Sequence, residues 1–494
     1  MVNHRRRTAG RRDGSPFLPP LVGLSCRDRG VGELHFVFTS IESLRRIGRI
    51  LGLAAIAVGG ASAWAAPGDP PASVVYSSSA AERIYAAAPA RLLQFRSLVA
   101  GAERQSSTGS GFLVTADGLA ITNYHVVSQV ALDPKTYRLE YAAADGSRGE
   151  AKLLAIDLAN DLAVARLEQR DAPFFTFDET AMARGLPKGE RLYSMGNPLD
   201  LGFTINEGIY NGLVERSYNE SMHFTGALNP GMSGGPAVMA EGLVVGVNVA
   251  KRTGAELVSF LVPARFAAAL LQRVRDNEMA PPQDFRAEIG RQLAARQASL
   301  YKSFDDRGFR SIAFGPYRAP ETTAPWFNCS AQTNAGAMPK PRASINSMNC
   351  RSDTNLFIAN DLAIGSIQLS HSYVTTADLN QFQFAAFLSR QSQPSVFPIL
   401  IVGTGPASRK WYATQRCHED FVAAAAAPNH PPLRVAWCAQ AYREFDDLYD
   451  VALTAVTEDH GREALVSRLG LQAVGYAEAI ALSKRFLQAV QSAK

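Results

Sequence analysis

Between Leu92 and Ala269 the chain is a succession of short apolar segments separated by Gly, Asn, Asp and Pro. Examples are GFLV, LAITN, LAVARL and LVVGVNV. Short runs of this kind, bounded by turn-forming residues, are typical of β-strands. Asp117-Gly118, between two of the runs, is a hairpin signal. Many short strands at this spacing predict a β-sandwich or a pair of β-barrels.

Three segments within this β-rich region hold residues that could act together in nucleophilic catalysis. His125 follows one predicted strand, Asp161 precedes another, and Ser233 lies in the Gly-rich turn NPGMSGGP. A serine hydroxyl needs an adjacent base, histidine can be that base, and a carboxylate orients the imidazole. Spacing alone leaves Asp157, in the loop before Asp161, as a rival for the acid.

The turn around Ser233 could also bind the oxyanion that forms when a carbonyl is attacked. Glycines allow a tight turn in which backbone N–H groups converge. We expect the N–H groups of Gly231 and Ser233 to be these donors. Taken alone, the same motif could be a phosphate-binding turn or an ordinary loop.

Together these segments resemble the trypsin-like serine peptidases, specifically the bacterial HtrA-type branch. The resemblance spans about residues 90–270 and rests on the motifs GSGF, TNYHVV, NDLAV, SMGNP, EGI, NPGMSGGP, GVN and SFLVP. It implies a two-barrel fold with the active site in the cleft, and it selects Asp161 over Asp157. It also implies hydrolysis of peptide bonds through an acyl-enzyme intermediate, without a metal or an organic cofactor.

The resemblance also suggests where the substrate side chain binds. It places Ala227 at the floor of the primary pocket, with Ser259 and Phe260 as further pocket candidates. Because Ala227 is small and uncharged, we expect a small or apolar residue before the scissile bond, although His223 could instead favour acidic residues. Met232 stands where the family commonly has Asn, a position that borders the leaving-group side.

The chain departs from the family after Pro263. No carboxylate-binding Gly-Leu-Gly-Phe-like loop follows, so we expect no PDZ domain. We therefore do not extend the oligomeric cages of the family to this chain. We divide the chain into a linker with a short helix (67–89), a protease domain (90–275), a helical connector (276–315) and a disulfide-containing α+β domain (316–494). Apolar residues at helical spacing predict the connector helix over 282–304. We also expect strands at 397–402 and 434–440, and helices from about Arg443 onward.

Four of the five cysteines fall in the last third of the chain. Cys329 and Cys350 are 21 residues apart, as are Cys417 and Cys438. In an exported chain, four cysteines suggest two disulfides. We favour the sequential pairs over the two other connectivities, and over a zinc site, because no Cys-x-x-Cys is present.

The basic residues are concentrated at the start of the chain. Residues 1–66 hold ten Arg, no Lys and four acids, whereas the remainder has 40 basic and 41 acidic residues. A nearly neutral body lacks the basic stripe that nucleic-acid binding needs. A signal peptide is expected over about 44–65, since this segment has arginines, then the apolar run ILGLAAIAV and then the small residues ASAWA. We interpret the residues before it as a start assigned too early; an uncleaved anchor is the alternative.

The sequence therefore predicts a periplasmic or secreted serine endopeptidase that acts on polypeptides. We expect no nucleic-acid partner and no membrane span once the signal peptide is removed. The alternative is a latent or inactive protease fold that acts as a binding or chaperone module through its C-terminal domain. Such a latent enzyme could have its cleft blocked by that domain.

Overall fold

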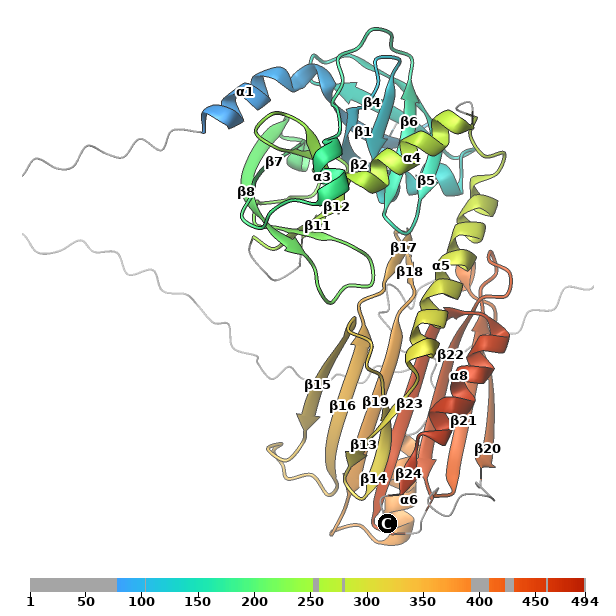
Figure 1. Ribbon diagram of the computed structural model, residues 1–494. Helices are drawn as coiled ribbons and strands as arrows, with labels where there is room; N and C mark the ends of the chain where they lie inside the picture. Colours follow the sequence, from blue (N-terminus) through green and yellow to red (C-terminus); the bar gives the residue numbers. More distant parts are fainter. Residues whose placement is uncertain are drawn as a thin grey trace, which may run out of the picture. The chain divides into compact units, whose positions relative to one another are not determined.

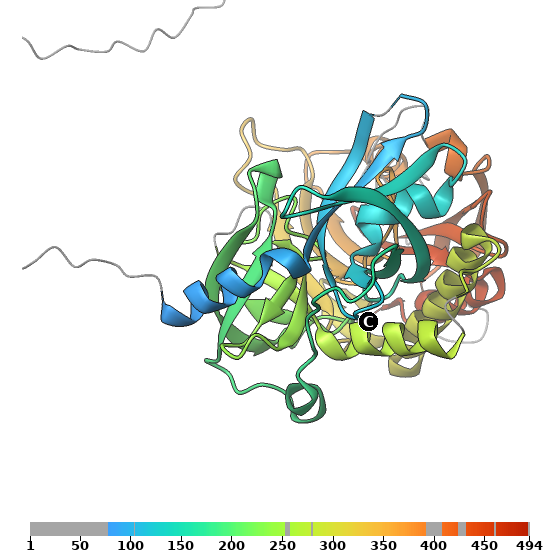
Figure 2. The same ribbon diagram turned by 90° about the horizontal axis from the view of Figure 1, so that it is seen from above.

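Strands of the first half close into two barrels, which decides between the two architectures that the strand spacing allowed. The computed structural model describes residues 78–102, 104–251, 257–277, 280–391, 408–422, 431–458 and 461–492 (Figure 1). The expected leader, signal peptide and strand at 397–402 lie outside these residues. Seen from above, the two barrels lie side by side (Figure 2).

The first barrel has the strand order β1-β2-β3-β6-β5-β4, with every neighbouring pair antiparallel. Its elements are β1 (Leu92–Val99), β2 (Arg104–Leu113), β3 (Leu119–Thr122), β4 (Tyr137–Ala143), β5 (Arg148–Asp157), β6 (Leu162–Leu167) and helix α2 (Tyr124–Leu132). The Asp117-Gly118 turn joins β2 to β3 as predicted, and Gly118 has a φ of +90° that favours glycine.

The second barrel has the order β10-β11-β12-β9-β8-β7. Its strands are β7 (Arg191–Gly196), β8 (Thr204–Leu213), β9 (Met222–Phe224), β10 (Pro236–Val238), β11 (Val244–Lys251) and β12 (Ser259–Pro263). The surrounding helices are α1 (Ser79–Ala87), α3 (Glu179–Arg184), α4 (Ala264–Asp276) and the 3-10 turns η1 (Pro89–Arg91) and η2 (Pro198–Asp200). Ser78 caps α1 by accepting a hydrogen bond from the N–H of Ala81.

Helix α5 (Phe285–Arg307) is the connector that the sequence predicted. It begins at Asp284, whose carboxylate accepts from the N–H of Arg286, and it ends at Gly308 with a φ of +62°. Ile289 and Leu293, in its first half, belong to the core of the first barrel, and Leu300 and Phe304 belong to the core of the C-terminal sheet. The helix thus joins two cores.

The C-terminal region is built on a seven-stranded antiparallel sheet of order β15-β16-β19-β23-β22-β21-β20. Its strands are β15 (Phe327–Thr333), β16 (Ser344–Ser352), β19 (Ile367–Thr375), β20 (Arg416–Val422), β21 (Leu433–Ala441), β22 (Tyr449–Thr457) and β23 (Glu463–Val474). The other elements are β13 (Arg310–Phe314), β14 (Tyr317–Glu321), β24 (Gln491–Ser492), the hairpin β17 (Leu356–Ala359) and β18 (Leu362–Ile364), and helices α6 (Gln381–Gln391), α7 (Ser408–Trp411) and α8 (Tyr476–Gln488).

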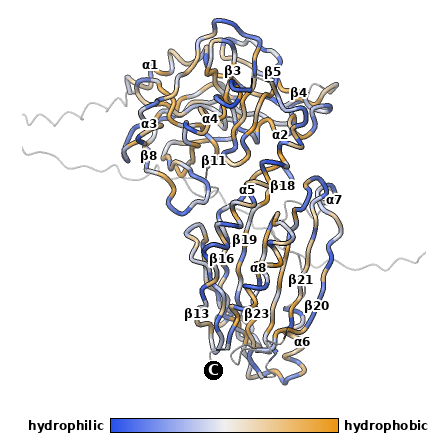
Figure 3. The backbone as a smooth tube through the Cα atoms, turned by 45° about the vertical axis from the view of Figure 1, so that its right-hand side comes forward, coloured by the Kyte–Doolittle hydropathy of each residue, from blue (hydrophilic) through white to orange (hydrophobic). Residues whose placement is uncertain are grey.

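The two faces of this sheet have separate cores. Leu469 on β23 packs with α5 and with Phe486 of α8, whereas Val466 on the opposite face packs with Phe384 and Leu388 of α6. Both faces are covered, and β22 is buried along nearly its whole length, whereas most of β19 alternates between buried and half-buried residues. Figure 3 shows hydrophobic and hydrophilic residues along the strands of this sheet.

The sequence predicted helices from about Arg443 to the end of the chain, and this prediction is wrong for the first part of that range. Strands β22 and β23 come first, and the only helix described after them is α8. All but the first residue of β22 are buried, so the strand lacks the alternation that would have distinguished it from a buried helix. The expected strand at 434–440 is confirmed as part of β21.

Both disulfides lie at the edges of the large sheet. Cys329 pairs with Cys350 and Cys417 pairs with Cys438, which is the expected sequential connectivity. In each pair the two cysteines are direct cross-strand partners, between β15 and β16 and between β20 and β21. Each bridge therefore fastens an edge strand, exposed along almost all of its length, to its inner neighbour.

The first barrel does not complete its own core. Leu356, Ile358, Leu362 and Ile364 of the β17–β18 hairpin are buried in one cluster with residues of the first barrel and of α2. Residues 74–494 accordingly form one compact unit. Helix α5 and the hairpin, which follow the barrels in sequence, therefore pack against the first barrel and α2, close to the predicted site.

Candidate active site

His125 lies in the first turn of α2, directly after β3. Asn123 precedes the helix, and its side-chain amide donates to the main-chain carbonyl of Asp161 at 2.7 Å. The N–H of Tyr124 donates to the same carbonyl at 3.1 Å. The start of α2 is thus tied to the loop between β5 and β6.

Asp161 holds His125 through both of its carboxylate oxygens. Oδ2 lies 2.6 Å from the imidazole Nδ1, and Oδ1 accepts the backbone N–H of His125 at 2.9 Å. Because an ionised carboxylate only accepts, Nδ1 holds a proton and Nε2 is left as the basic nitrogen. Asp161 has a φ of +52°, an uncommon conformation for a residue with a side chain.

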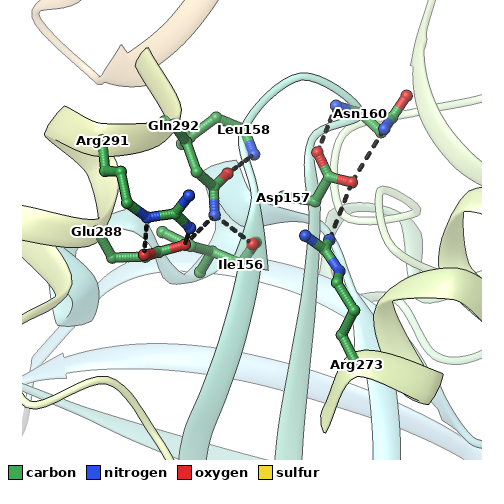
Figure 4. Close-up of polar contacts among 8 residues, drawn as sticks. All are labelled: Ile156, Asp157, Leu158, Asn160, Arg273, Glu288, Arg291 and Gln292. Carbon is green, nitrogen blue, oxygen red and sulfur yellow. Dashed lines mark hydrogen bonds and ion pairs between the residues drawn. The ribbon is translucent and has the colours of Figure 1, made fainter. Parts of the chain in front are cut away.

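The rival carboxylate, Asp157, has different partners. Its oxygens accept from the backbone and side-chain amides of Asn160 at 3.2 and 2.9 Å, and Arg273 of α4 lies 3.4 Å away (Figure 4). Asp157 therefore stabilises its own loop, while Asp161 contacts the imidazole. The choice that the family resemblance implied agrees with this geometry.

Two opposing effects act on the pKa of His125. Burial lowers the pKa of the imidazole, because the charged form loses hydration. The charge of Asp161 and its hydrogen bond raise it, and the net pKa is above the ordinary value of 6.5. The pair is therefore suited to hold a proton once His125 has accepted one.

The turn that holds Ser233 is fixed from two sides. Ser110 of β2 donates through Oγ to the carbonyl of Gly231 at 2.6 Å and through its N–H to the carbonyl of Ser233 at 2.7 Å. Asn248 of β11 donates through Nδ2 to the carbonyl of Met232 at 3.2 Å. Gly231 and Gly234 have φ values of +97° and +86°, a conformation that strongly favours glycine.

The orientation of the peptide before Gly231 concerns the expected oxyanion donors. The carbonyl of Pro230 accepts from the N–H of Leu199 at 2.9 Å. Since N–H and C=O point in opposite directions across a trans peptide, the N–H of Gly231 points away from Leu199. In the part of the chain that the structure describes, neither this N–H nor that of Ser233 has a hydrogen-bond partner.

A cavity of about 300 Å³ lies between the barrels and is lined by His125, Gly231 and Ser233 together. The other residues that line it are Thr108, Leu228, Asn229, Pro230, Asn248 and Val249. Within it, Ser233 Oγ donates to the carbonyl of Val249 at 3.1 Å. To contact His125, the hydroxyl would have to rotate about the Cα–Cβ bond into another staggered rotamer.

None of the three residues predicted for the substrate pocket is among the residues that line this cavity. Ala227 is exposed and precedes the lining residue Leu228. Ser259 and Phe260 lie on β12, where they pair with Phe224 and His223 of β9.

Met232 is fully buried in the core of the second barrel. The expectation that this position borders the leaving-group side stays a prediction. The residue before the nucleophile contributes to packing at this position.

Ser110 and Asn248 are positioning residues whose roles the sequence analysis did not recognise. Both lie in segments that carry the family resemblance, GSGF and GVN, so a signal was present. Their targets are main-chain carbonyls of a distant turn. Spacing along the chain does not reveal such contacts.

Within the described ranges, the structure shows neither a cluster of three or more possible metal ligands nor a helix of the length and apolarity that a bilayer span needs. The residues gathered at the cavity are Ser233, the His125–Asp161 pair and the turn of Gly231. A set of this kind can transfer an acyl group to a serine.

Comparison with known proteins agrees with this geometry over the barrels. The family model for the trypsin-like peptidase domain matches residues 109–247. A Synechocystis protein named as a serine protease, HhoB, is 35% identical over 35% of this chain and 41% of its own length. A Chlamydia muridarum protein named as a DegP-like periplasmic serine endoprotease is 29% identical over 40% of each chain.

The chain spans about two fifths of the length of these relatives. Among solved structures, a serine endoprotease from Yersinia pestis is 25% identical, covers 41% of this chain and 69% of its own, and gives a TM-score of 0.35. The match to the family model ends at residue 247, within β11 of the second barrel.

Proposed function

Residues 109–247 form a trypsin-like peptidase domain related to the HtrA and DegP proteases, and on this premise we propose that the chain is an exported serine endopeptidase. The observation that supports the proposal most is the cavity that brings together Ser233, the His125–Asp161 pair and the free N–H of Gly231. These are the parts that acyl transfer to a serine requires.

In the proposed mechanism, Ser233 Oγ attacks the carbonyl carbon of the scissile peptide bond. Its proton passes to Nε2 of His125, while Asp161 stabilises the imidazolium through Nδ1. The N–H groups of Gly231 and Ser233 stabilise the oxyanion. His125 then gives the proton to the leaving amine as the C–N bond breaks, and a water molecule repeats the sequence to release the acyl group and restore Ser233.

The walls of the cavity support a preference for a small or apolar residue before the scissile bond. Leu228, Pro230 and Val249 present no charge, and trypsin-like selection of Arg or Lys would need an acid at the pocket base. Ala227, as the floor, and Ser259 and Phe260 remain the proposed residues of the primary substrate pocket. Peptide-library profiling checks the preference, and cleavage after Arg, Lys or Glu would contradict it.

Export is proposed on the leader composition together with the naming of relatives as periplasmic. We expect cleavage of the signal peptide within or near ASAWA. Mass spectrometry of the N-termini of the precursor and mature forms tests this proposal. A mature protein that retained Ile50–Val58 would argue for an anchored chain.

The alternative, a binding or chaperone module on an inactive protease fold, is favoured by one observation. Ser233 Oγ donates to Val249 in place of His125. None of the residues that line the cavity comes from the C-terminal sheet, so nothing described supports a cleft blocked by that region.

A fluorophosphonate probe separates the two functions. Full-length mature protein should be labelled at Ser233, and Ser233→Ala should abolish labelling. Ser299→Ala, an exposed serine on α5, is the matched control and should label normally. Folded wild-type protein that resists the probe and cleaves no casein or peptide library would favour the alternative.

A further inference from the structure

We infer that the chain beyond the barrels positions the base and the acid of the active site, through Phe357 on the β17–β18 hairpin and Gln292 on α5. The inference rests on the proposed function. It assigns two positioning residues that lie outside the peptidase domain and touch neither substrate nor reacting atoms.

The first contact is between the hairpin and the start of α2. The ring of Phe357 meets the imidazole of His125 edge to face, with centroids 5.9 Å apart and planes at 73°. The hydroxyl of Tyr124 donates to the carbonyl of Ile358 at 2.8 Å, in a buried position. Asp161 fixes His125 at Nδ1, and Phe357 restricts the ring from a second direction.

The second contact is between α5 and the loop that carries Asp161. The side chain of Gln292 accepts from the N–H of Leu158 at 2.9 Å and donates to the carbonyl of Ile156 at 2.8 Å (Figure 4). The carbonyl of Leu158 in turn accepts from the N–H of Asp161 at 3.3 Å. Gln292 therefore completes the hydrogen bonding of the chain three residues before the catalytic acid.

The two contacts are linked through the same helix and sheet. Gln297, on α5 like Gln292, donates to the carbonyls of Gln472 and Ala473 at the end of β23. Gln472 exchanges two hydrogen bonds with Ser366, just beyond the hairpin, at 3.1 Å each. A shift of the C-terminal sheet against the barrels would thus move both supports together.

Neither Phe357 nor Gln292 lines the cavity. Loss of either contact should therefore leave ground-state binding of substrate intact and impair only the alignment of the proton-transferring pair. Misalignment of a catalytic group by about 1 Å can cost a factor on the order of 100. The expected signature is a lower kcat at constant KM.

The main test is Phe357→Leu in the full-length protein. We expect kcat to fall by about 10-fold or more, with KM within about twofold of wild type. The matched control is Phe387→Leu, because Phe387 is likewise half-buried but packs on α6 against the far face of the sheet. Phe357→Tyr retains the ring and should restore activity. Equal effects of the two Leu variants would overturn the inference.

The pH profile gives a readout that general loss of stability would not change. The acid limb of kcat/KM reports the pKa of His125 in the free enzyme. Since burial lowers this pKa, water admitted by Phe357→Leu should move the limb to higher pH. A limb that coincides with wild type, at reduced kcat, would argue for a purely structural role.

Gln292→Met tests the second contact, because methionine has similar length and makes neither hydrogen bond. We expect a reduced kcat at unchanged KM. Lys302→Met on the solvent side of the same helix, where Lys302 pairs with Asp306, is the control and should have no effect. Wild-type kcat in Gln292→Met would remove Gln292 from the inference.

A measurement without catalysis separates this inference from the proposed function. In Ser233→Ala protein with ¹³C-labelled histidine, the imidazole of His125 is assigned by its loss in His125→Gln. Phe357→Leu should change its chemical shift, through the lost ring current, and its titration. Unchanged signals would overturn the positioning role, whereas changed signals in a protein without peptidase activity would refute only the proposed function.

Discussion

The two barrels differ in how they obtain their cores. The second barrel packs Leu192, Phe224, Met232 and Leu261 with other residues of its own strands and turns, and it shares a further core with the first barrel, α1 and α4. The first barrel shares its core with α5 and the β17–β18 hairpin, and with Trp411 and neighbours more than 200 residues further along the chain. The nucleophile turn thus belongs to the barrel whose described core includes nothing beyond α4, and the His125–Asp161 pair belongs to the barrel whose core extends to α5 and the hairpin.

This difference teaches that two halves of a region that is continuous in sequence can differ in how much their stability depends on residues outside that region. Burial of apolar surface stabilises by about 25 cal/mol per Å². Removal of Ile289, Ile358 and Ile364 would expose the apolar surface that they cover on the first barrel. The second barrel would lose none of its described core residues. Perturbations of the two barrels should therefore have different consequences.

The largest effect is expected from a chain that ends after Asn277. It lacks α5 and the hairpin, so the first barrel should fail to fold and probe labelling should disappear. Soluble yield and fluorophosphonate labelling measure both effects. A truncated protein that is labelled faster than the full chain would contradict the comparison and would indicate release from inhibition.

The next largest effect is expected from Asp161→Asn. The amide can no longer hold the imidazole in the productive tautomer, and kcat should fall by about 10⁴-fold with little change in thermal stability. Steady-state kinetics and thermal unfolding measure the two quantities. Asp157→Asn is the control, since the carboxylate of Asp157 bonds to Asn160 and Arg273 and not to His125 in the described structure, and it should retain most activity.

Ile358→Ala and Leu261→Ala compare the two cores directly. Both side chains are fully buried, and each substitution should lower the free energy of unfolding by about 2–5 kcal/mol. Only Ile358→Ala should also increase hydrogen exchange of the α2 amides, because α2 packs on the hairpin. Equal exchange of α2 in both variants would show that the two cores are not separable.

The smallest effect concerns pH and a buried carboxylate that contacts Tyr442 and Ala473 of the shared core. Asp450 accepts from the hydroxyl of Tyr442 at 2.7 Å and from the N–H of Ala473 at 3.0 Å. Burial raises the pKa of its carboxyl from 3.8 to about 6, although these hydrogen bonds oppose the shift. The stability that the protonated form provides is complete below pH 3.8 and is lost as pH rises towards about 6.

Asp450→Asn should therefore remove this pH-dependent loss. The difference in Tm between Asp450→Asn and wild type should grow from about pH 4 to about pH 6 and then remain constant. Thermal unfolding at a series of pH values measures it. A difference that is constant from pH 4 upward would mean that Asp450 ionises as freely in the folded state as in the unfolded one.

The sequence predicted the barrels and the candidate site because both depend on local signals. The NDLAV motif identified Asp161, and the turn around Ser233 has glycines where positive φ values require them. The connector helix followed from its apolar spacing. What the sequence did not reveal depends on contacts between distant segments, such as Ser110 with Gly231 or Gln292 with Leu158.

The C-terminal sheet was harder to predict for a related reason. Its central strands are covered on both faces, so periodicity could not distinguish β22 from a helix. No family pattern reaches the hairpin, and nothing in the segment LFIANDLAI indicates that it packs beside His125. Leu356 and Ile358 are apolar residues that could pack in any core, and only the fold shows that they join the core of the first barrel.

The position of Phe357 against His125 also has a consequence for how such a protein can evolve. A gene fusion that exchanged the segment after Asn277 for an unrelated module would remove the contact of Phe357 with His125 together with the C-terminal sheet. Recombination should therefore keep the barrels, α5 and the hairpin together. Changes that create a surface for a new binding partner should occur at the edges of the sheet, where β15 and β20 are exposed and each is held by a disulfide.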